Sequence, residues 1–212
     1  MLLELTQLKI QPGQQILLDR VSWKQFESIL TELGERRATR VSYSNGLLEI
    51  MVPLPEHEKA KETIGAIVKL LLTERGIDYN ALGSTTLKSE RMTQGVEPDT
   101  CFYIQNQSLS IGKNRLDLSI DPPSDLAIEI NLTSRDHLGN CRSLGVPELW
   151  RYDKQGLQVY LLQGGEYVES AVSPTFLDLP IVELVNNCVR QSRSIGSSQA
   201  IKELRSWIKE NV

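Results

Sequence analysis

Two carboxylates lie in apolar segments of the chain, where an acidic side chain is unusual. Asp99 precedes the apolar residues 101–104, and Glu129 lies inside the apolar run 126–130. A carboxylate in a buried strand is costly unless it is paired or binds a cation. Two of them on neighbouring strands can hold Mg²⁺, which prefers oxygen ligands and can activate a water beside a scissile phosphate. These residues therefore indicate a metal site suited to phosphoryl chemistry.

The same two residues also have a purely structural interpretation. Asp99 follows Pro98, so it can be a turn residue or a cap. Glu129 can pair with Arg135 or with Lys88. Structural ion pairs and metal sites look alike in sequence, so both interpretations stay open.

The first third of the chain predicts a helix, a hairpin and a second helix. Ser22 can cap a helix whose apolar residues recur at helical spacing until Gly34 stops it. Asn45-Gly46 is a strong turn signal inside a hairpin of residues 41–52. A long amphipathic helix follows over about residues 56–75.

After residue 76 the hydrophobic period changes to two, which favours short strands. The expected strands cover residues 77–82, 85–88, 99–104, 126–130, 149–152, 157–162 and 166–172. We expect a loop over 105–125, with room for a short strand, a short helix within 133–144 and two helices after 180. This order predicts an α/β (α+β) fold with a mixed β-sheet flanked by helices. The expected organisation is an N-terminal arm (1–20), a core domain (21–175) and a C-terminal helical extension packing on the core (176–212).

Composition narrows the class of protein. The 212 residues include 23 basic and 27 acidic side chains, a net charge of −4, which disfavours nucleic-acid binding through charge alone. Three cysteines without a C-x-x-C pair and two histidines argue against a structural zinc site, and we expect buried, inert thiols. No apolar stretch approaches the ~20 residues that span a bilayer, and the N-terminus lacks a signal peptide. We therefore expect a soluble cytoplasmic protein without membrane contact.

Several common catalytic motifs are absent from the sequence. There is no G-x-x-x-x-G-K-[ST], no G-x-G-x-x-G, no G-x-S-x-G and no H-E-x-x-H. The usual nucleotide-hydrolase and acyl-hydrolase interpretations therefore lose most of their support.

Several segments, in their order and spacing, resemble the Uma family of bacterial restriction-type endonucleases, a branch of the PD-(D/E)xK nuclease superfamily. They are the Asn45-Gly46 hairpin and residues 53–57, 96–99, 125–130, 133–135 and 145–153. The resemblance implies a restriction-endonuclease-like core, a mixed central sheet flanked by helices with a metal site at one sheet edge. It also implies Mg²⁺ or Mn²⁺ as cofactor, hydrolysis of phosphodiester bonds in DNA, and a homodimer.

The resemblance assigns roles to both carboxylates. Asp99 matches the first carboxylate of the superfamily motif and Glu129 the second, so both would be metal ligands and catalytic residues. The lysine expected two positions after Glu129 is Asn131 in this chain. Lys88, from a neighbouring strand, would then align the attacking water or stabilise the developing charge.

Further charged residues complete the candidate site. His57 resembles a histidine that the family carries at this helix start, where it can bind a phosphate or take part in proton transfer. Arg135 and Arg142 are candidates for phosphate contacts and, like Lys88, substitutes for the missing lysine. An arginine stays charged, so it clamps a phosphate better than it transfers a proton. Glu58, near the start of the second long helix, matches a helical acid that faces the metal in this superfamily. Glu62, one turn later, is interpreted as a solvated surface charge, and for Glu58 both interpretations stay open.

The leading hypothesis is a divalent-metal-dependent DNA endonuclease. The alternative is a catalytically inactive relative that serves as a nucleic-acid-binding or dimerisation module. Asn131 in place of the lysine and the short segment after Arg135 motivate that alternative. A scaffold that does not bind nucleic acid is a third option, consistent with the acidic charge balance.

Overall fold

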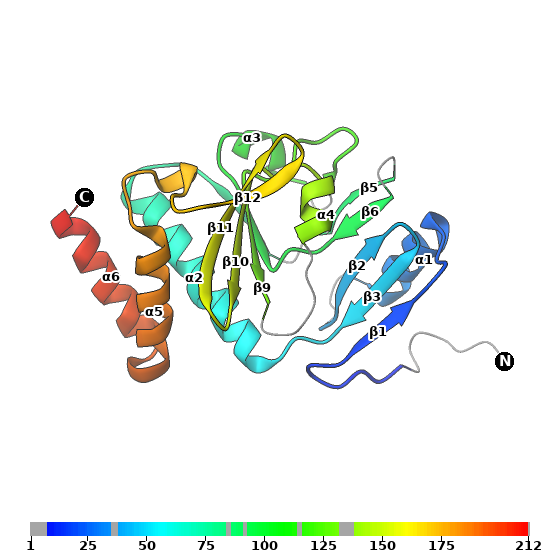
Figure 1. Cartoon of the computed structure of the whole chain (residues 1–212), viewed down its shortest axis with the longest axis horizontal. Helices are drawn as coiled ribbons and strands as arrows, with labels where there is room; N and C mark the ends of the chain where they lie inside the picture. Colours follow the sequence, from blue (N-terminus) through cyan, green and yellow to red (C-terminus); the bar gives the residue numbers. More distant parts are fainter. Residues whose placement is uncertain are drawn as a thin grey trace.

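The structure is a computed structural model that describes residues 8–34, 38–83, 86–90, 93–113, 116–131 and 138–211. The strands form two six-stranded sheets, and helices flank them (Figure 1). Each sheet combines parallel and antiparallel neighbours. The predicted class, a mixed α/β fold with flanking helices, is therefore confirmed, with the difference that the strands are divided between two sheets.

The first sheet, sheet A, contains the N-terminal hairpin and has the order β1-β3-β2-β6-β5-β8. Strands β2 (Arg40–Ser44) and β3 (Leu47–Met51) pair in antiparallel fashion, as predicted. The turn residues Asn45 and Gly46 have φ angles of 47° and 90°, the left-handed conformation that a two-residue hairpin turn requires. The other strands are β1 (Gln15–Leu18), β5 (Leu87–Ser89), β6 (Gln94–Val96) and β8 (Leu116–Asp117).

The second sheet, sheet B, has the order β12-β11-β10-β9-β7-β4. Strand β9 (Leu126–Ile130) is central, parallel to β10 (Glu148–Asp153) and antiparallel to β7 (Thr100–Tyr103). Its nearly continuous apolar sequence is typical of a strand buried on both faces. The other strands are β4 (Asn80–Leu82), β11 (Gly156–Gln163) and β12 (Glu166–Ser170).

The first two helices begin at local signals in the sequence. Helix α1 (Trp23–Leu33) starts at Ser22, whose hydroxyl accepts from the Gln25 N–H while the Gln25 side chain accepts from the Ser22 N–H. Helix α2 (Pro55–Glu74) starts with a proline, which is well suited to a first helical turn. The remaining helices are α3 (Gln107–Ser110), α4 (Leu138–Ser143), α5 (Ile181–Ile195) and α6 (Ser197–Asn211), with a 3₁₀ turn at Pro174–Phe176. Within the described residues, no helix combines the length and apolar character needed to cross a membrane.

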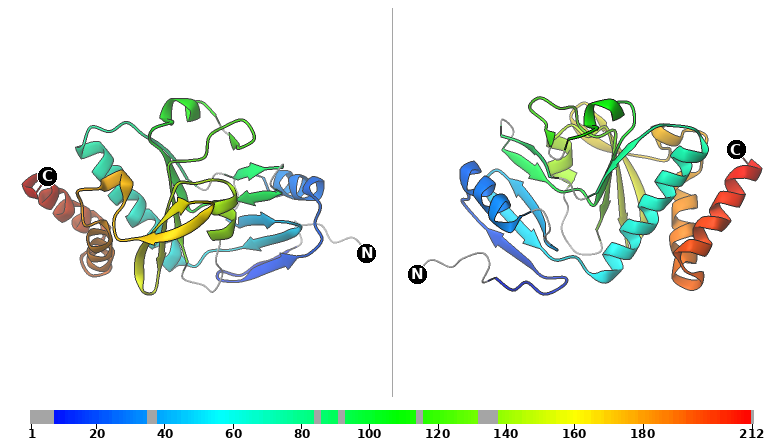
Figure 2. Two further views of the ribbon diagram at one scale, coloured as in Figure 1. Left: turned by 45° about the horizontal axis from the view of Figure 1, so that its top comes forward. Right: turned by 180° about the vertical axis from the view of Figure 1, so that it is seen from behind.

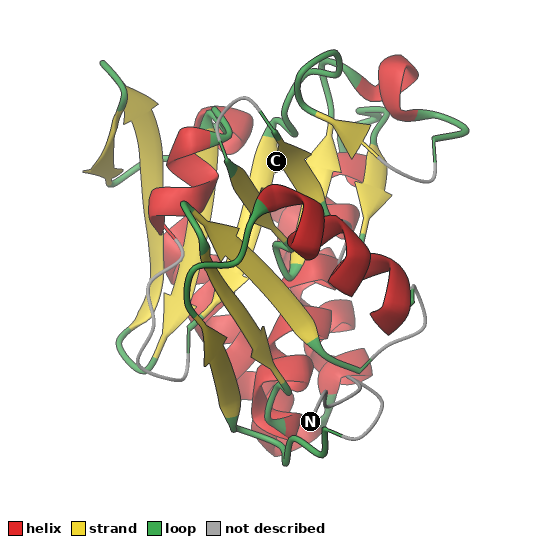
Figure 3. Cartoon of the chain, turned by 90° about the vertical axis from the view of Figure 1, so that its right-hand side faces the viewer, coloured by secondary structure: helices red, strands yellow, loops and turns green. Residues whose placement is uncertain are grey.

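The two sheets and the helices are arranged in layers. Helices α2, α5 and α6 lie on one side of sheet B, and sheet A lies on the other side with α4 between the sheets (Figures 1 and 2). Helix α1 packs against sheet A (Figure 3). Strand alternation explains the layers, because Leu126, Ile128 and Ile130 of β9 join the helix-side core while Ala127 joins the cluster between the sheets.

Some elements differ from the sequence expectations. Residues 94–96 form β6, and the expected loop over 105–125 contains α3 besides the short strand β8. These segments of two to four residues are too short to show a hydrophobic period. The short helix expected within 133–144 is present as α4, while residues 132–137 lie outside the described residues.

Candidate metal centre

Asp99 lies at the junction of the two sheets, between β6 of sheet A and β7 of sheet B, with its side chain only 4% exposed. Its Oδ2 accepts a hydrogen bond from the Ile130 N–H at 2.7 Å and lies 3.1 Å from Nε2 of His57. Its Oδ1 lies 3.7 Å from Nε of Arg40. The buried carboxylate is therefore compensated by one amide and two basic side chains.

The first turn of α2 brings His57 and Glu58 to Asp99. The His57 side chain is 8% exposed, and its Nδ1 lies 3.5 Å from Oε1 of Glu58. This Nδ1 is buried and has no hydrogen-bond partner among the described residues. The imidazole thus lies between two carboxylates. A neutral imidazole ring carries a single N–H, so only one of the two carboxylates can accept a hydrogen bond from it. The other ring nitrogen then points its lone pair at a carboxylate oxygen, unless a proton or a cation lies between them.

Glu58 is the partly exposed member of this group, with 40% of its side chain accessible. Its Oε1 accepts from Nη2 of Arg40 at 3.4 Å, and its Oε2 accepts from Nζ of Lys61. Partial burial acts to raise the pKa of Glu58, but Lys61, Arg40 and His57 outweigh burial and lower the pKa below its ordinary value. Glu58 is therefore ionised at neutral pH, and the positive end of the helix dipole favours that charge.

Glu129 lies beside Asp99 on the neighbouring strand. Thr100 of β7 is opposite Ile128 of β9, and the next step along this antiparallel pairing places Asp99 opposite Glu129. The residues on either side of Glu129 in β9 point to the helices, so Glu129 faces the layer between the sheets. Its Oε1 is 3.7 Å from Sγ of Cys141 in α4. Glu129 therefore lies in β9 and Asp99 directly before the adjacent strand β7, so the two carboxylates are neighbours as the sequence predicts, while their roles as metal ligands stay a prediction.

Three of these side chains have donor atoms arranged for a metal ion. One nitrogen of His57 and one oxygen each of Glu58 and Asp99 lie within 4.8 Å of one another. Carboxylate oxygens suit Mg²⁺ and Mn²⁺, and imidazole suits first-row transition metals. The unpartnered, buried Nδ1 of His57 is a further sign that this group fits a divalent cation. Glu129 is not part of the three-residue group but supplies another carboxylate on the adjacent strand.

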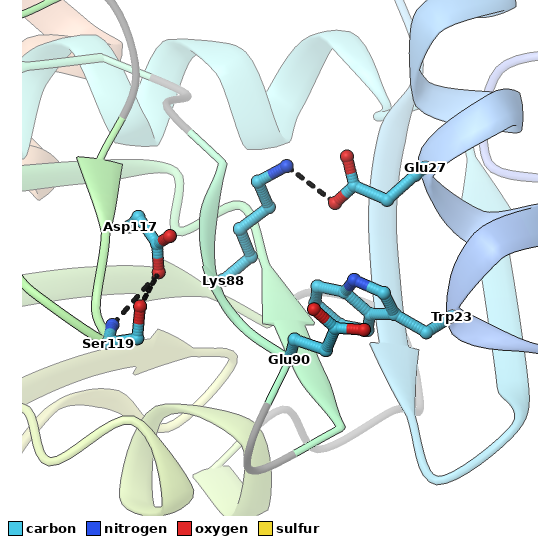
Figure 4. A pocket seen from close by; sticks show the side chains of 6 residues that line it. All are labelled: Trp23, Glu27, Lys88, Glu90, Asp117 and Ser119. Atoms are coloured by element: carbon cyan, nitrogen blue, oxygen red, sulfur yellow. Dashed lines mark hydrogen bonds and ion pairs between the residues drawn. The ribbon is translucent and has the colours of Figure 1, made fainter.

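Lys88 is not brought to Asp99. Lys88 alternates with the buried Leu87 along β5, so it lies on the face of sheet A opposite to the layer between the sheets. Its Nζ is 2.5 Å from Oε1 of Glu27 in α1. Figure 4 shows this pair in a separate cleft of about 530 Å³, which is also lined by Trp23, Glu90, Asp117 and Ser119. The catalytic role of Lys88 stays a prediction, and its expected proximity to the carboxylates is not seen because strand alternation turns it away.

The other charged candidates lie at different places. Arg142 of α4 forms an ion pair with Glu166 of β12. Arg135 lies outside the described residues. Glu62 is 79% exposed beside Lys61, as expected for a surface charge.

Arg40 and Lys61 belong to the site although the sequence analysis does not single them out. In β2, Val41 and Tyr43 are buried on one face, so the alternation of a strand predicts that Arg40 points to the opposite face. The sequence does not show that a second sheet lies on that opposite face. Lys61 is three residues after Glu58 on one helix, and this spacing could have indicated their ion pair.

Comparison with solved structures identifies the class of the fold. The chain resembles a crystal structure described as a "putative nuclease belonging to DUF820" from Anabaena variabilis ATCC 29413, with a TM-score of 0.51. The match covers 79% of this chain and 90% of that chain at 17% sequence identity, so the likeness concerns the fold. The two chains therefore share a mixed α/β fold, which in this chain places Asp99 and Glu129 side by side where the two sheets meet. No curated protein matches the chain.

A family model then identifies the family. The model of the Uma2 family, described as "Putative restriction endonuclease", matches residues 23–188, which is more than half of the chain. The chain therefore belongs to the Uma2 family. The resemblance found in the sequence motifs is confirmed.

Proposed function

We propose that this protein is a divalent-metal-dependent endonuclease that hydrolyses phosphodiester bonds of DNA in the cytoplasm, with Mg²⁺ or Mn²⁺ as cofactor. The observation that carries this proposal is the position of Asp99, beside Glu129 on the adjacent strand and in contact with His57 from helix α2. Membership of the Uma2 family supports DNA as the substrate.

Asp99 and Glu129 are the proposed carboxylate ligands. A bound divalent ion would supply an activated water and stabilise negative charge on the scissile phosphate. The protein holds Asp99 for this task through the Ile130 N–H and His57, so the carboxylate needs little reorganisation.

Arg40 is the proposed substitute for the lysine that is absent at Asn131. Its side chain is 16% exposed and reaches both Asp99 and Glu58. A guanidinium remains charged at any working pH and donates in a planar fork that matches phosphate oxygens. Arg40 would therefore stabilise charge on the phosphate, while Arg135 and Arg142 remain candidates for contacts with the DNA backbone.

Replacing Asp99 by alanine tests the assignment. We expect metal-dependent cleavage of plasmid DNA to fall at least ~100-fold, because changes to outer-sphere residues alone cost 10–100-fold in metal sites. The measurement is the rate of plasmid nicking and linearisation with Mg²⁺ and with Mn²⁺. Asp78→Ala is the matched control, since Asp78 is exposed beyond the C-terminal end of α2. Equal cleavage rates for Asp99→Ala and the wild type would exclude Asp99 as a ligand needed for the reaction.

The second candidate function is a DNA-binding or dimerisation module without catalysis. Two observations favour it. Asn131 replaces the lysine of the superfamily motif, and Lys88 pairs with Glu27 away from the carboxylates. Among the described residues, the basic side chains in contact with Asp99 are therefore Arg40 and His57 and not a lysine. Saturable binding of a DNA duplex without cleavage under Mg²⁺ or Mn²⁺ would support this candidate over the nuclease.

A homodimer is the proposed assembly, on the strength of the family resemblance. Sedimentation velocity of the purified chain tests it. A single species at the monomer mass of 23.9 kDa across micromolar concentrations would contradict it.

A further inference from the structure

The geometry points to Glu97 as a positioning residue, which holds the guanidinium of Arg40 in place beside Asp99. This inference rests on the proposed function, because it concerns how the site of that function is assembled. It assigns a role to a buried carboxylate that the candidate metal centre does not use. Glu97 acts through the backbone of its two neighbours and is not a ligand.

Glu97 lies where the chain leaves sheet A and enters sheet B. It follows Val96, the last residue of β6, and it precedes Pro98 and Asp99. The backbone pairing of β6 with β2 and with β5 ends at Val96. Pro98 has no N–H, so it cannot donate a further hydrogen bond to either neighbouring strand. Another group must therefore hold the end of β6 to its neighbours.

The Glu97 carboxylate connects the strands on either side of β6. Its Oε2 accepts a hydrogen bond from the Val41 N–H of β2 at 3.1 Å. Its Oε1 accepts a hydrogen bond from the hydroxyl of Thr86, directly before β5, at 2.7 Å. Glu97 is only 6% exposed, and a buried backbone N–H needs an acceptor. The side chain of Glu97 supplies that acceptor, so one carboxylate links β2, β6 and β5.

Arg40 and Asp99 are each joined to this carboxylate by a short stretch of backbone. Arg40 precedes Val41, and the N–H that Glu97 accepts belongs to the planar peptide bond between these two residues. Asp99 is two residues after Glu97, and the ring of Pro98 fixes the backbone rotation between them. Glu97 therefore sets the distance between the backbone of Arg40 in sheet A and that of Asp99 at the start of sheet B.

The position of the Arg40 guanidinium is sensitive to small shifts. Its Nε lies 3.7 Å from Oδ1 of Asp99, and its Nη2 lies 3.4 Å from Oε1 of Glu58. The buried Nε makes no hydrogen bond among the described residues. Because N–H donors form hydrogen bonds within about 2.7–3.2 Å, a movement of less than ~1 Å decides what the guanidinium can reach. A displacement of ~1 Å at a reacting centre costs about 100-fold in rate.

Two variants of Glu97 in the full chain test the proposal by nuclear magnetic resonance, without DNA or metal. Glu97→Met keeps a similar length but removes both acceptors. Glu97→Gln retains an oxygen for the Val41 N–H, and its NH₂ can donate to the Thr86 hydroxyl. We expect Glu97→Met to shift the ¹H–¹⁵N resonance of the Arg40 Nε–H, and Glu97→Gln to leave it close to the wild-type position. Loss of the signal in Arg40→Lys assigns it. An unchanged resonance in Glu97→Met would overturn the proposal.

Glu148→Met is the matched control for a general loss of stability. Glu148 is also buried, at 3% exposed, and it accepts from the N–H and the hydroxyl of Thr175. It shares its face of β10 with Trp150, which belongs to the core under the helices. Glu148→Met should therefore lower the free energy of unfolding and leave the Arg40 resonance in place. A shift as large as that of Glu97→Met would overturn the proposal.

Thr86→Val keeps the proposal testable if Glu97→Met does not fold. It removes one of the two hydrogen bonds of the Glu97 carboxylate and leaves the acid in place. We expect the Arg40 resonance to move in the same direction by a smaller amount. A spectrum identical to that of the wild type would then overturn the proposal.

Cleavage kinetics provide the second readout. We expect kcat of Glu97→Met to fall ~10–100-fold with KM close to that of the wild type, and Glu97→Gln to restore kcat. In an Arg40→Ala background, Glu97→Met should cause no further fall, because Glu97 acts through Arg40. A further fall of the full size would overturn the proposal. A wild type that does not cleave DNA would contradict the proposed function alone, since the resonance of Arg40 is read without cleavage.

Discussion

Individual side chains in the layer between the sheets are charged, buried and mutually dependent. Asp99 is 4% exposed, and Arg40 and His57 are the basic groups that contact it. Removing one partner of such a group leaves an uncompensated charge, which costs about 3–5 kcal/mol. The motif Pro98-Asp99 makes the carboxylate recognisable in the sequence. Arg40 carries no such signal, because it is 59 positions away along the chain and comes from the other sheet.

The three cysteines, two in the layer between the sheets and one in α5, should be unreactive. Burial raises the pKa of Cys101 to about 12 and that of Cys188 to about 11, and it raises the pKa of Cys141 well above its ordinary value, with the Glu129 charge adding to the effect. A raised pKa leaves the thiol protonated, so at pH 8 the thiolate fraction is on the order of 0.1% or less. We expect no rapid reaction of the native protein with a disulfide reagent at pH 8.

Guanidinium chloride provides the control for the thiol prediction. In the unfolded protein, all three cysteines should react with the disulfide reagent at the rate of an exposed free thiol. A thiol that reacts equally fast in the native and unfolded protein would contradict the burial of that residue.

At the scale of elements, local signals account for most of what the sequence predicts. Ser22 and Gln25 form the capping box of α1, Asn45-Gly46 forms the hairpin turn, and the apolar run of β9 forms a central strand. Each of these depends on residues that are close together in the chain. The assignment of Lys88 depended instead on which face of β5 meets sheet B, and that is decided by contacts between distant segments.

Strand β6 illustrates a feature that a local pattern does not contain. Gly95 has no side chain to contribute to a hydrophobic period, yet its strand is paired on both sides by β2 and β5. The ring of Phe26 from α1 occupies the space where a side chain would lie. The strand is therefore specified by the packing of a helix that precedes it by about 70 residues.

Gly95→Ala should destabilise the protein through this contact. The added Cβ would lie 2.7 Å from Cζ of Phe26, which is fully buried and stacks on Tyr43 at 4.6 Å between ring centroids. Overpacking of this kind costs about 1–3 kcal/mol. Urea unfolding measures the change in the free energy of unfolding.

Gly83→Ala is the matched control for Gly95→Ala. A Cβ at Gly83 meets no atom within 4 Å, so its effect should stay within about 0.5 kcal/mol. Equal stabilities of the two variants would mean that Phe26 moves aside without loss, and that α1 does not specify β6.

At the scale of the whole molecule, three apolar clusters connect the layers. One lies between α1 and sheet A, one between sheet B and helices α2, α5 and α6, and a third joins Leu87 and Val96 of sheet A to Ala127 and Leu149 of sheet B. The candidate metal centre lies where the sheets meet, so its geometry depends on both. The division into an arm, a core and a C-terminal extension remains a prediction, and the continuity of these clusters favours one cooperative unit.

Phe26→Leu tests that cooperativity at a distance. Phe26 belongs to the cluster under α1, and its truncation should cost about 1–3 kcal/mol. If the molecule unfolds as one unit through the shared cluster between the sheets, native-state hydrogen exchange should show the same loss of protection for the most protected amides of β2 and of β9. A loss confined to β2 would mean that sheet A opens independently. The two halves of the metal centre could then separate while sheet B stays folded. An ion that binds only the folded junction of the sheets stabilises that junction. Addition of Mn²⁺ should therefore restore the hydrogen-exchange protection of β2.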